Sequence, residues 1–336
     1  MWLPLHASLS MTSRDRGCFS QLWPHTGVKL STSYFFDCLR GSVSVRTVAV
    51  IGSGTMGSGI AQVCAQTGWE TRLFDAFPDS LQKGMNSINE FWKGGIVRGK
   101  NTEEQVKEWS HKLIPCENLE EALLGVDLVI EAVPEKIDLK RSIFQKIEHL
   151  APENAILATN TSGLRISDIA SVVKNPGRVV GMHFFNPVPI MKLLEVIKHD
   201  LSSDGIINEV IEIGREMGKT TIVVGDIPGF ATSRLGVVLG NEAIRMLAEG
   251  VASASDIDTA MKLGYKHPMG PLELSDLVGL DVRRDILNNL AESFDDPSYL
   301  PHPLLVTLVE SGELGKKTGR GIYNWSEEGK SEREDL

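Results

Sequence analysis

Two residues of the sequence, a histidine and a glutamate, have the types and the surroundings needed for proton transfer. His183 ends the apolar run "RVVGMH", and Glu195 lies in "KLLEVI". A histidine can take up a proton near neutral pH, because its reference pKa is about 6.5. A glutamate buried among leucines needs a partner, and beside an imidazole it would fix the tautomer and stabilise the protonated ring. A structural histidine at a strand end and an outward-facing glutamate are the alternative interpretations of these two residues.

A glycine-rich stretch, "VAVIGSGTMGSGIAQ", carries a second kind of chemistry. Gly52, Gly54 and Gly57 form a G-x-G-x-x-G pattern between a short β-branched run and apolar residues at helical spacing. In a dinucleotide site the first glycine makes a tight turn, the second admits a pyrophosphate and the third lets helix and strand pack closely. The N–H groups at the helix start would bind the anion. A plain tight connection is the alternative.

An acidic residue at the end of the next apolar run, "ETRLFDA", favours the dinucleotide interpretation. Asp75 follows Gly57 by eighteen residues. A carboxylate at this place accepts a hydrogen bond from the ribose 2′-hydroxyl and repels a 2′-phosphate, so the expected cofactor is NAD. The alternative is a solvated turn residue ahead of Pro78.

The elements that must position these residues alternate between strand and helix from Val48 onward, which is typical of a doubly wound parallel sheet. We therefore expect an α/β fold, with a Rossmann-like domain over residues 46–226 and a helical hairpin insertion over 78–112. His183 would stand at the carboxyl end of a strand, where such sheets bind ligands. The turn through Pro187 and Pro189 would fold Glu195 back beside it. Residues 227–326 have helical periodicity and predict an all-α domain, followed by a polar tail over 327–336.

Composition excludes several classes of protein. The 336 residues are 42% hydrophobic and fit about two domains. The formal net charge is −10 although the first 46 residues are basic, so nucleic acid is not an expected partner. No apolar run is long enough to span a membrane. The four cysteines lie far apart without C-x-x-C, so we expect no metal site and no disulfide framework, as in a reducing compartment.

The first 45 residues differ from the rest of the chain. They are rich in serine and arginine and poor in acids. This is the composition of a transit peptide, which predicts the mitochondrial matrix. The alternative is an untranslated or disordered extension, with Met11 or a later site as the true start, on a cytoplasmic protein.

Five further motifs come in the order and approximate spacing of one family: "TNTSGL", "HFFNPVPIMKLLEVI", "DIPGF", "HPMGPLELSDLVGLD" and "GKKTGRGIYNW". Over residues 46–325 the chain resembles the 3-hydroxyacyl-CoA dehydrogenases, and within them the short-chain 3-hydroxybutyryl-CoA enzymes. The resemblance implies a Rossmann-like NAD domain, an α-helical domain that carries most of a homodimer contact, and an active site in the cleft between them.

The activity that the resemblance implies is NAD-dependent oxidation of L-3-hydroxyacyl-CoA to 3-ketoacyl-CoA, as in fatty-acid β-oxidation. In the family pattern His183 is the base and Glu195 its partner. Ser162 matches a serine that hydrogen-bonds the reacting oxygen, and Asn186 an asparagine near the nicotinamide and the substrate carbonyl.

Other binding residues follow from the same resemblance. The positions that match nucleotide contacts are Glu135, Lys140 and Lys317. Lys93 matches a lysine that contacts the CoA phosphates, although a neighbouring family serine is replaced here by Asn86. Ser233 stands where the family commonly has asparagine, next to the acyl thioester, so substrate range is the open question.

Two other functions stay open. One is an NAD-dependent dehydrogenase of a CoA-free hydroxy acid, as in the gulonate dehydrogenase and λ-crystallin branch. The other is a non-catalytic binding or structural protein on the same fold, since a fold does not determine function. A second histidine, His267 in "KHPMGP", is interpreted as part of a helix-start turn.

Overall fold

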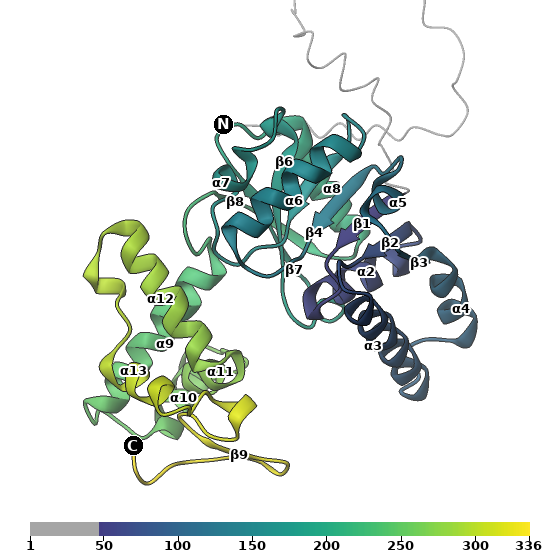
Figure 1. Ribbon diagram of the computed structural model, residues 1–336. Helices are drawn as coiled ribbons and strands as arrows, with labels where there is room; N and C mark the ends of the chain where they lie inside the picture. Colours follow the sequence, from purple (N-terminus) through teal and green to yellow (C-terminus); the bar gives the residue numbers. More distant parts are fainter. Residues whose placement is uncertain (1–46) are drawn as a thin grey trace, which may run out of the picture. The chain divides into compact units, whose positions relative to one another are not determined.

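The structure of the protein is a computed structural model, and it describes residues 47–336 (Figure 1). The expected leader, residues 1–45, lies outside the described residues. Within the described part of the chain, no helix is long and apolar enough to cross a lipid bilayer.

The first domain is built on one eight-stranded sheet with the order β3-β2-β1-β4-β5-β6-β7-β8. Its strands are β1 (Thr47–Ile51), β2 (Glu70–Phe74), β3 (Leu113–Cys116), β4 (Leu128–Glu131), β5 (Ile156–Thr159), β6 (Val179–Phe184), β7 (Leu193–Lys198) and β8 (Thr220–Gly225). The order of β1 to β6 is that of a Rossmann sheet, which confirms the predicted fold class. The expectation of a parallel sheet is wrong for the last two strands. β7 pairs antiparallel with β6, and β8 is parallel to β7.

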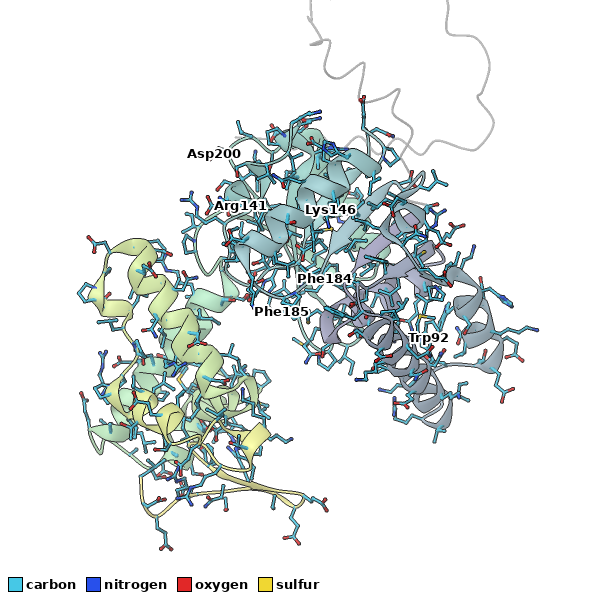
Figure 2. All side chains as sticks on the ribbon, in the orientation of Figure 1. Trp92, Arg141, Lys146, Phe184, Phe185 and Asp200 are labelled. Carbon is cyan, nitrogen blue, oxygen red and sulfur yellow. The ribbon has the colours of Figure 1, made fainter. Side chains whose placement is uncertain are left out.

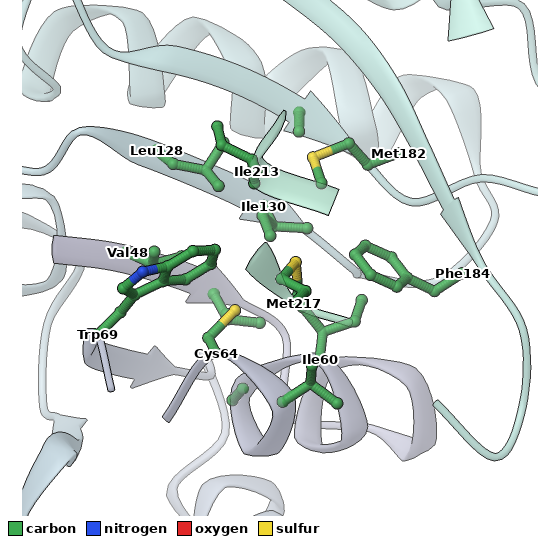
Figure 3. Packing of buried hydrophobic residues seen from close by; sticks show 14 of the residues in the cluster. Val48, Ile60, Cys64, Trp69, Leu128, Ile130, Met182, Phe184, Ile213 and Met217 are labelled. Atoms are coloured by element: carbon green, nitrogen blue, oxygen red, sulfur yellow. The ribbon is translucent and has the colours of Figure 1, made fainter. Parts of the chain in front are cut away.

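Helices cover both faces of this sheet because its buried strands are apolar on both sides. Val48 and Val50 pack toward α2 (Thr55–Gln66), α3 (Pro78–Val97) and α8 (Asp204–Glu216). Ala49 and Ile51 face the opposite way, toward α5 (Leu119–Leu123), α6 (Ile137–Leu150) and α7 (Ile166–Ala170). Figure 3 shows the first of these two cores, with Ile60 of α2, Ile213 of α8 and Met217 just after α8 packed against strand residues.

Residues 78–112, expected as a helical hairpin, fold into α3 and α4 (Glu103–Lys112). The second helix begins with a capping box, in which Thr102 and Gln105 each bind the other's backbone N–H. The two helices meet at Trp92 and Trp109, whose ring centroids are 6.0 Å apart. This hairpin is thus packed on itself and on the sheet.

The second domain is mainly helical and has its own apolar core, in which Ile244, Leu272, Leu290 and Leu305 are fully buried. Its helices are α9 (Thr232–Ala248), α10 (Ala254–Gly264), α11 (Pro271–Val278), α12 (Leu280–Phe294) and α13 (Pro303–Glu310). The expected polar tail is in part a short hairpin strand, β10 (Gly329–Ser331), paired with β9 (Asn324–Ser326). Short 3₁₀ turns complete the chain: η1 (Pro176–Arg178), η2 (Pro297–Tyr299) and η3 (Lys316–Thr318).

The antiparallel pair β6–β7 is the part of the sheet that matters most for the site. Phe185 follows β6 and Asp200 follows β7, and Figure 2 shows Asp200 at the upper left of the domain and Phe185 well below it. Antiparallel pairing requires this arrangement. It also places His183 directly opposite Glu195 in the register of the two strands.

Candidate active site

His183 and Glu195 form a buried, hydrogen-bonded pair. His183 Nδ1 lies 2.7 Å from Glu195 Oε2. The glutamate is fully buried, and the histidine keeps 6% of its surface exposed. The residues before and after each of them in the strands pack in the core on the side of α2, α3 and α8. Because successive side chains of a strand point to opposite faces, His183 and Glu195 both lie on the other face of the sheet. With Nδ1 committed to the glutamate, Nε2 is the nitrogen left for a ligand.

The Glu195 carboxylate has a second partner, Thr232, at the first turn of α9. The Thr232 N–H donates to Oε1 and its hydroxyl donates to Oε2, each at 3.0 Å. Burial by itself raises the pKa of Glu195, but the hydrogen bonds from His183 and Thr232 outweigh it and hold that pKa below its usual value. The carboxylate is therefore an anion over the whole neutral range.

Two aromatic rings flank His183. The rings of Phe185 and Phe230 lie 4.5 Å and 5.9 Å from the imidazole, centroid to centroid. Phe230 has a φ of +49°, a conformation that a bulky side chain rarely adopts. The turn at Phe230 brings its ring to the histidine and comes just before α9, whose first residue is Thr232. Strained backbone of this kind is common at functional sites.

The glycine loop has the geometry that the sequence predicted. Gly52 has a φ of +100°, and a Cβ there would lie 2.7 Å from the Ala132 carbonyl oxygen. A Cβ on Gly57 would lie 1.8 Å from the Gly52 carbonyl oxygen, so helix and turn can pack this closely only with glycine. Around Gly54 nothing lies within 4 Å of such a Cβ. The open space faces the start of α2, which has no side-chain cap and no acid in its first turn, so its N–H groups are free for a pyrophosphate.

Asp75 is held by the same loop. Its Oδ2 accepts hydrogen bonds from the N–H and the hydroxyl of Ser53, both at 2.8 Å, and its Oδ1 accepts one from the Phe77 N–H at 3.0 Å. The carboxylate thus has a defined orientation at the end of β2. Ser53, the variable residue inside the glycine pattern, was not predicted to have this function.

One cavity of about 950 Å³ gathers most of the predicted residues. It lies at the carboxyl ends of the strands, where Rossmann sheets bind ligands. The predicted residues that line it are Gly52, Gly54, Asp75, Glu135, Ser162, His183 and Asn186. Glu135 accepts hydrogen bonds from the Ser162 N–H, at 2.9 Å, and from the Thr161 hydroxyl. The residues predicted to bind the cofactor and the residue predicted to be the base therefore line the same cavity.

A smaller cavity of about 370 Å³ adjoins the glycine loop between α2, α3 and the turn after Asn186. Its cationic residue is Lys83, with Ser80 and Ser87 on the same side of α3. The signal in the sequence is their spacing of three and four residues, which puts side chains on one helix face. Lys93, the lysine predicted to contact CoA, is exposed on α3 and lines neither of these two cavities.

Three other predicted contacts lie apart from the large cavity. Lys140 is fully buried, and its ammonium contacts Glu131 at 2.8 Å. Lys317 is in the helical domain, where it pairs with Asp281 at 2.6 Å. Ser233 is half-buried beside Thr232, and within residues 47–336 its hydroxyl has no hydrogen-bond partner. Their contacts with nucleotide or substrate stay predictions.

The turn that carries Asn186 is anchored by a lysine that the sequence analysis missed. Lys219 is 7% exposed, and its ammonium donates to the carbonyls of Val188 and Met191. Burial lowers the pKa of Lys219 to about 8. Nothing local in the sequence signals this contact, because the lysine lies about thirty residues after its acceptors.

The described residues contain no group of three or more histidine, cysteine, aspartate or glutamate side chains placed to hold a metal ion. Cys64 and Cys116 are buried free thiols.

The comparison with known proteins decides the family. The model of the 3-hydroxyacyl-CoA dehydrogenase NAD binding domain matches residues 47–227, and the model of that family's C-terminal domain matches 229–325. The chain belongs to the 3-hydroxyacyl-CoA dehydrogenase family. It is an oxidoreductase of this family with NAD as its cofactor.

Individual relatives agree with this assignment. A probable 3-hydroxybutyryl-CoA dehydrogenase of Bacillus subtilis is 42% identical over 285 residues, covering 85% of this chain and 99% of the relative. A mitochondrial hydroxyacyl-coenzyme A dehydrogenase of Rattus norvegicus is 41% identical and covers 84% of this chain and 92% of its own length. The crystal structure of (S)-3-hydroxybutyryl-CoA dehydrogenase from Ralstonia eutropha superposes with a TM-score of 0.81 at 40% identity, covering 84% of this chain and all of the other.

Proposed function

We propose that this protein oxidises short-chain L-3-hydroxyacyl-CoA esters, such as 3-hydroxybutyryl-CoA, to 3-ketoacyl-CoA. The observation that carries the proposal is the His183–Glu195 pair at the wall of the cavity that the glycine loop and Asp75 also line. This arrangement supports the proposal, because a dehydrogenase needs a base for the hydroxyl proton beside its nucleotide.

The reaction removes a proton from the hydroxyl oxygen and a hydride from the carbon that carries it, and each has its own acceptor. Bound NAD supplies the acceptor for the hydride. His183 takes the hydroxyl proton at Nε2, and as both leave, the C–O bond becomes a carbonyl. Glu195 stabilises the imidazolium that forms and keeps Nδ1 protonated throughout. Ser162 and Asn186, which line the same cavity, would donate hydrogen bonds to the reacting oxygen and to the thioester carbonyl.

The test is NADH formation by the purified protein from (S)-3-hydroxybutyryl-CoA, measured beside gulonate and with NADP in place of NAD. We expect turnover with the CoA ester and NAD, because Asp75 repels a 2′-phosphate. Turnover with gulonate alone would instead place the protein among dehydrogenases of CoA-free hydroxy acids. Equal kcat/KM for NAD and NADP would contradict the assignment of Asp75.

We further propose that the protein is a homodimer through its helical domain. Apolar side chains are exposed at positions three and four apart on two helices: Leu235, Val238 and Leu239 on α9, and Leu274, Leu277 and Val278 on α11. Such stripes mark a surface that another protein covers. Light scattering should give twice the chain mass, and Leu235→Glu should lower it to that of one chain. A wild-type chain that is monomeric at micromolar concentration would refute this proposal.

The composition of residues 1–45 supports a mitochondrial location, and the rat and mouse relatives carry the word mitochondrial in their names. We propose that this segment is a transit peptide. The mature protein should then begin near residues 42–46 and fractionate with mitochondria. A cytosolic protein that starts at Met1 would contradict this.

A further inference from the structure

The hydrogen bonds to Glu195 identify a further residue that acts on the base. Oxygen Oε2 of Glu195 is hydrogen-bonded to both His183 Nδ1 and the Thr232 hydroxyl, and its oxygen Oε1 accepts a hydrogen bond from the Thr232 N–H. Both donor groups of one residue therefore bind the acid that orients the histidine. The carboxylate has no exposed surface, so no solvent competes with these bonds.

The chain reaches this position through the left-handed residues Gly229 and Phe230. Immediately after them α9 begins, and the N–H groups of a first helical turn have no partner within the helix. One of them, that of Thr232, is satisfied by Glu195. The positive end of a helix dipole also favours a negative charge here. The backbone contact belongs to the fold, whereas the hydroxyl contact depends on the residue type at 232.

We propose that Thr232 is a positioning residue for the His183 base: its hydroxyl holds Glu195 Oε2 against the imidazole and limits how strongly that oxygen attracts the imidazole proton. This inference rests on the proposed role of His183 in proton abstraction. It assigns a function to a residue that does not line the large cavity.

The direction of the effect follows from shared acceptance. A carboxylate oxygen that already accepts a hydrogen bond from a hydroxyl group attracts a second donor less strongly. The imidazolium is then stabilised less, and the neutral base persists to lower pH. Removal of the hydroxyl should leave Oε2 to His183 alone, so that the imidazolium forms at higher pH and the acid limb of the activity profile moves upward.

The other groups around His183 and Glu195 should not mask a shift of the acid limb. On β8 the residue paired with Glu195 is Ile222, and the rings that flank His183 are Phe185 and Phe230. The guanidinium of Arg234, on the same helix as Thr232, lies over the rings of Phe294 and Tyr299. The titratable residues that share the large cavity with His183 are Asp75 and Glu135. Asp75 is hydrogen-bonded to the glycine loop. Glu135 accepts hydrogen bonds from Thr161 and Ser162 and lies 3.7 Å from the Lys140 ammonium.

The test is the pH dependence of kcat/KM for 3-hydroxybutyryl-CoA oxidation in full-length variants. Thr232→Val keeps the N–H and the side-chain shape but removes the hydroxyl, and it should raise the midpoint of the acid limb by about half to one pH unit. Thr232→Ser keeps a hydroxyl and should restore the wild-type midpoint. Thr232→Ala gives the same test if the valine does not fold.

A matched control exists at Thr159, whose hydroxyl donates to another buried glutamate, Glu131, at 2.6 Å. Thr159→Val makes the same chemical change away from His183 and should keep the wild-type midpoint. A Thr232→Val protein with the wild-type midpoint would overturn the inference. So would a Thr232→Ser protein shifted as far as the valine variant.

His183→Ala, measured in parallel, separates this inference from the proposed function. If His183→Ala keeps the wild-type rate, the proposed base is wrong and the inference fails with it. If His183→Ala is inactive while Thr232→Val has an unchanged profile, only the role of Thr232 is refuted.

Discussion

Two glutamates in the sheet of the first domain have almost the same kinds of partner but lie in different surroundings. Glu131 ends β4 and Glu195 lies in β7, and both are fully buried. Each accepts hydrogen bonds from one threonine hydroxyl and one backbone N–H, and each is paired with one basic side chain. The basic partner is Lys140 for the first and His183 for the second.

The partner and its surroundings make the difference. Lys140 has no exposed surface and also donates to the Asn160 carbonyl, so its three donors are used within the protein. Burial raises the pKa of Glu131, whereas hydrogen bonding prevails at Glu195 and lowers its pKa. His183 instead keeps one ring nitrogen at the cavity wall. We call the buried Lys140–Glu131 pair the closed pair, and Lys140 also lies 3.7 Å from Glu135. We call His183–Glu195 the open pair, because His183 lines the large cavity and can exchange a proton with a ligand there.

Breaking the open pair should have the largest effect on activity. His183→Ala should lower kcat by roughly 10²–10⁴-fold, the range expected when a general base is lost. NAD affinity should change little, because the glycine loop and Asp75 remain. Steady-state rates and a separate NAD titration measure the two quantities. Adding Glu195→Gln to this variant should cost little more, since the two residues act as a unit; a fully additive loss would contradict that.

Breaking the closed pair should instead reduce stability. Lys140→Met leaves the Glu131 carboxylate buried without its counter-charge, which should lower the free energy of unfolding by about 3–5 kcal/mol. Denaturant titration measures this change. The double variant Lys140→Met with Glu131→Gln removes both charges and should recover part of the loss. If Lys140→Met were as stable as wild type but bound NAD weakly, Lys140 would be a cofactor contact after all.

The pH dependence of kcat/KM in Glu195→Gln tests whether the charge of Glu195 acts on His183. Because its pKa lies below the usual value, Glu195 is ionised wherever activity is measured, and the amide removes that charge. The imidazolium then loses its partner, so the acid limb of kcat/KM should move down by about one pH unit or more. This is opposite in sign to the shift expected for Thr232→Val. The maximal rate should also fall, and an unchanged limb would show that Glu195 does not act on the base.

The smallest effect is expected next to Thr232. Ser233 has no hydrogen bond among the described residues, so Ser233→Asn should stay active and change kcat/KM by no more than about fivefold, or roughly 1 kcal/mol. Rates on CoA esters of increasing chain length would show whether it changes substrate range. A correctly folded but inactive variant would give Ser233 a role in the reaction.

The sequence by itself determined the parts of the site that depend on local order. The sequence predicts the places of Gly52 and Gly57, because the tight turn requires a backbone conformation and a close approach that only glycine allows. It predicts the place of Asp75, because the length of the helix and of the next strand puts this residue at the strand end. The His183–Glu195 pair followed from two adjacent strands and the turn between them, and period-two alternation puts both on one face. The helical hairpin and the helical second domain followed from periodicity of 3.6 residues.

Only the tertiary structure decided which polar groups meet across long stretches of chain. Thr232 reaches Glu195 over 37 residues, and Lys140 reaches the carbonyl after β5 over 20. The tertiary structure also decided three other features: the direction of β7 and β8, the burial of Lys140, and the place of Lys83 at the smaller cavity. A residue's type and spacing state what it can bond to, but its partner is set by where the packed sheet and helices bring the other side chains. That is why the base was predicted from the sequence and the hydroxyl that tunes it was not.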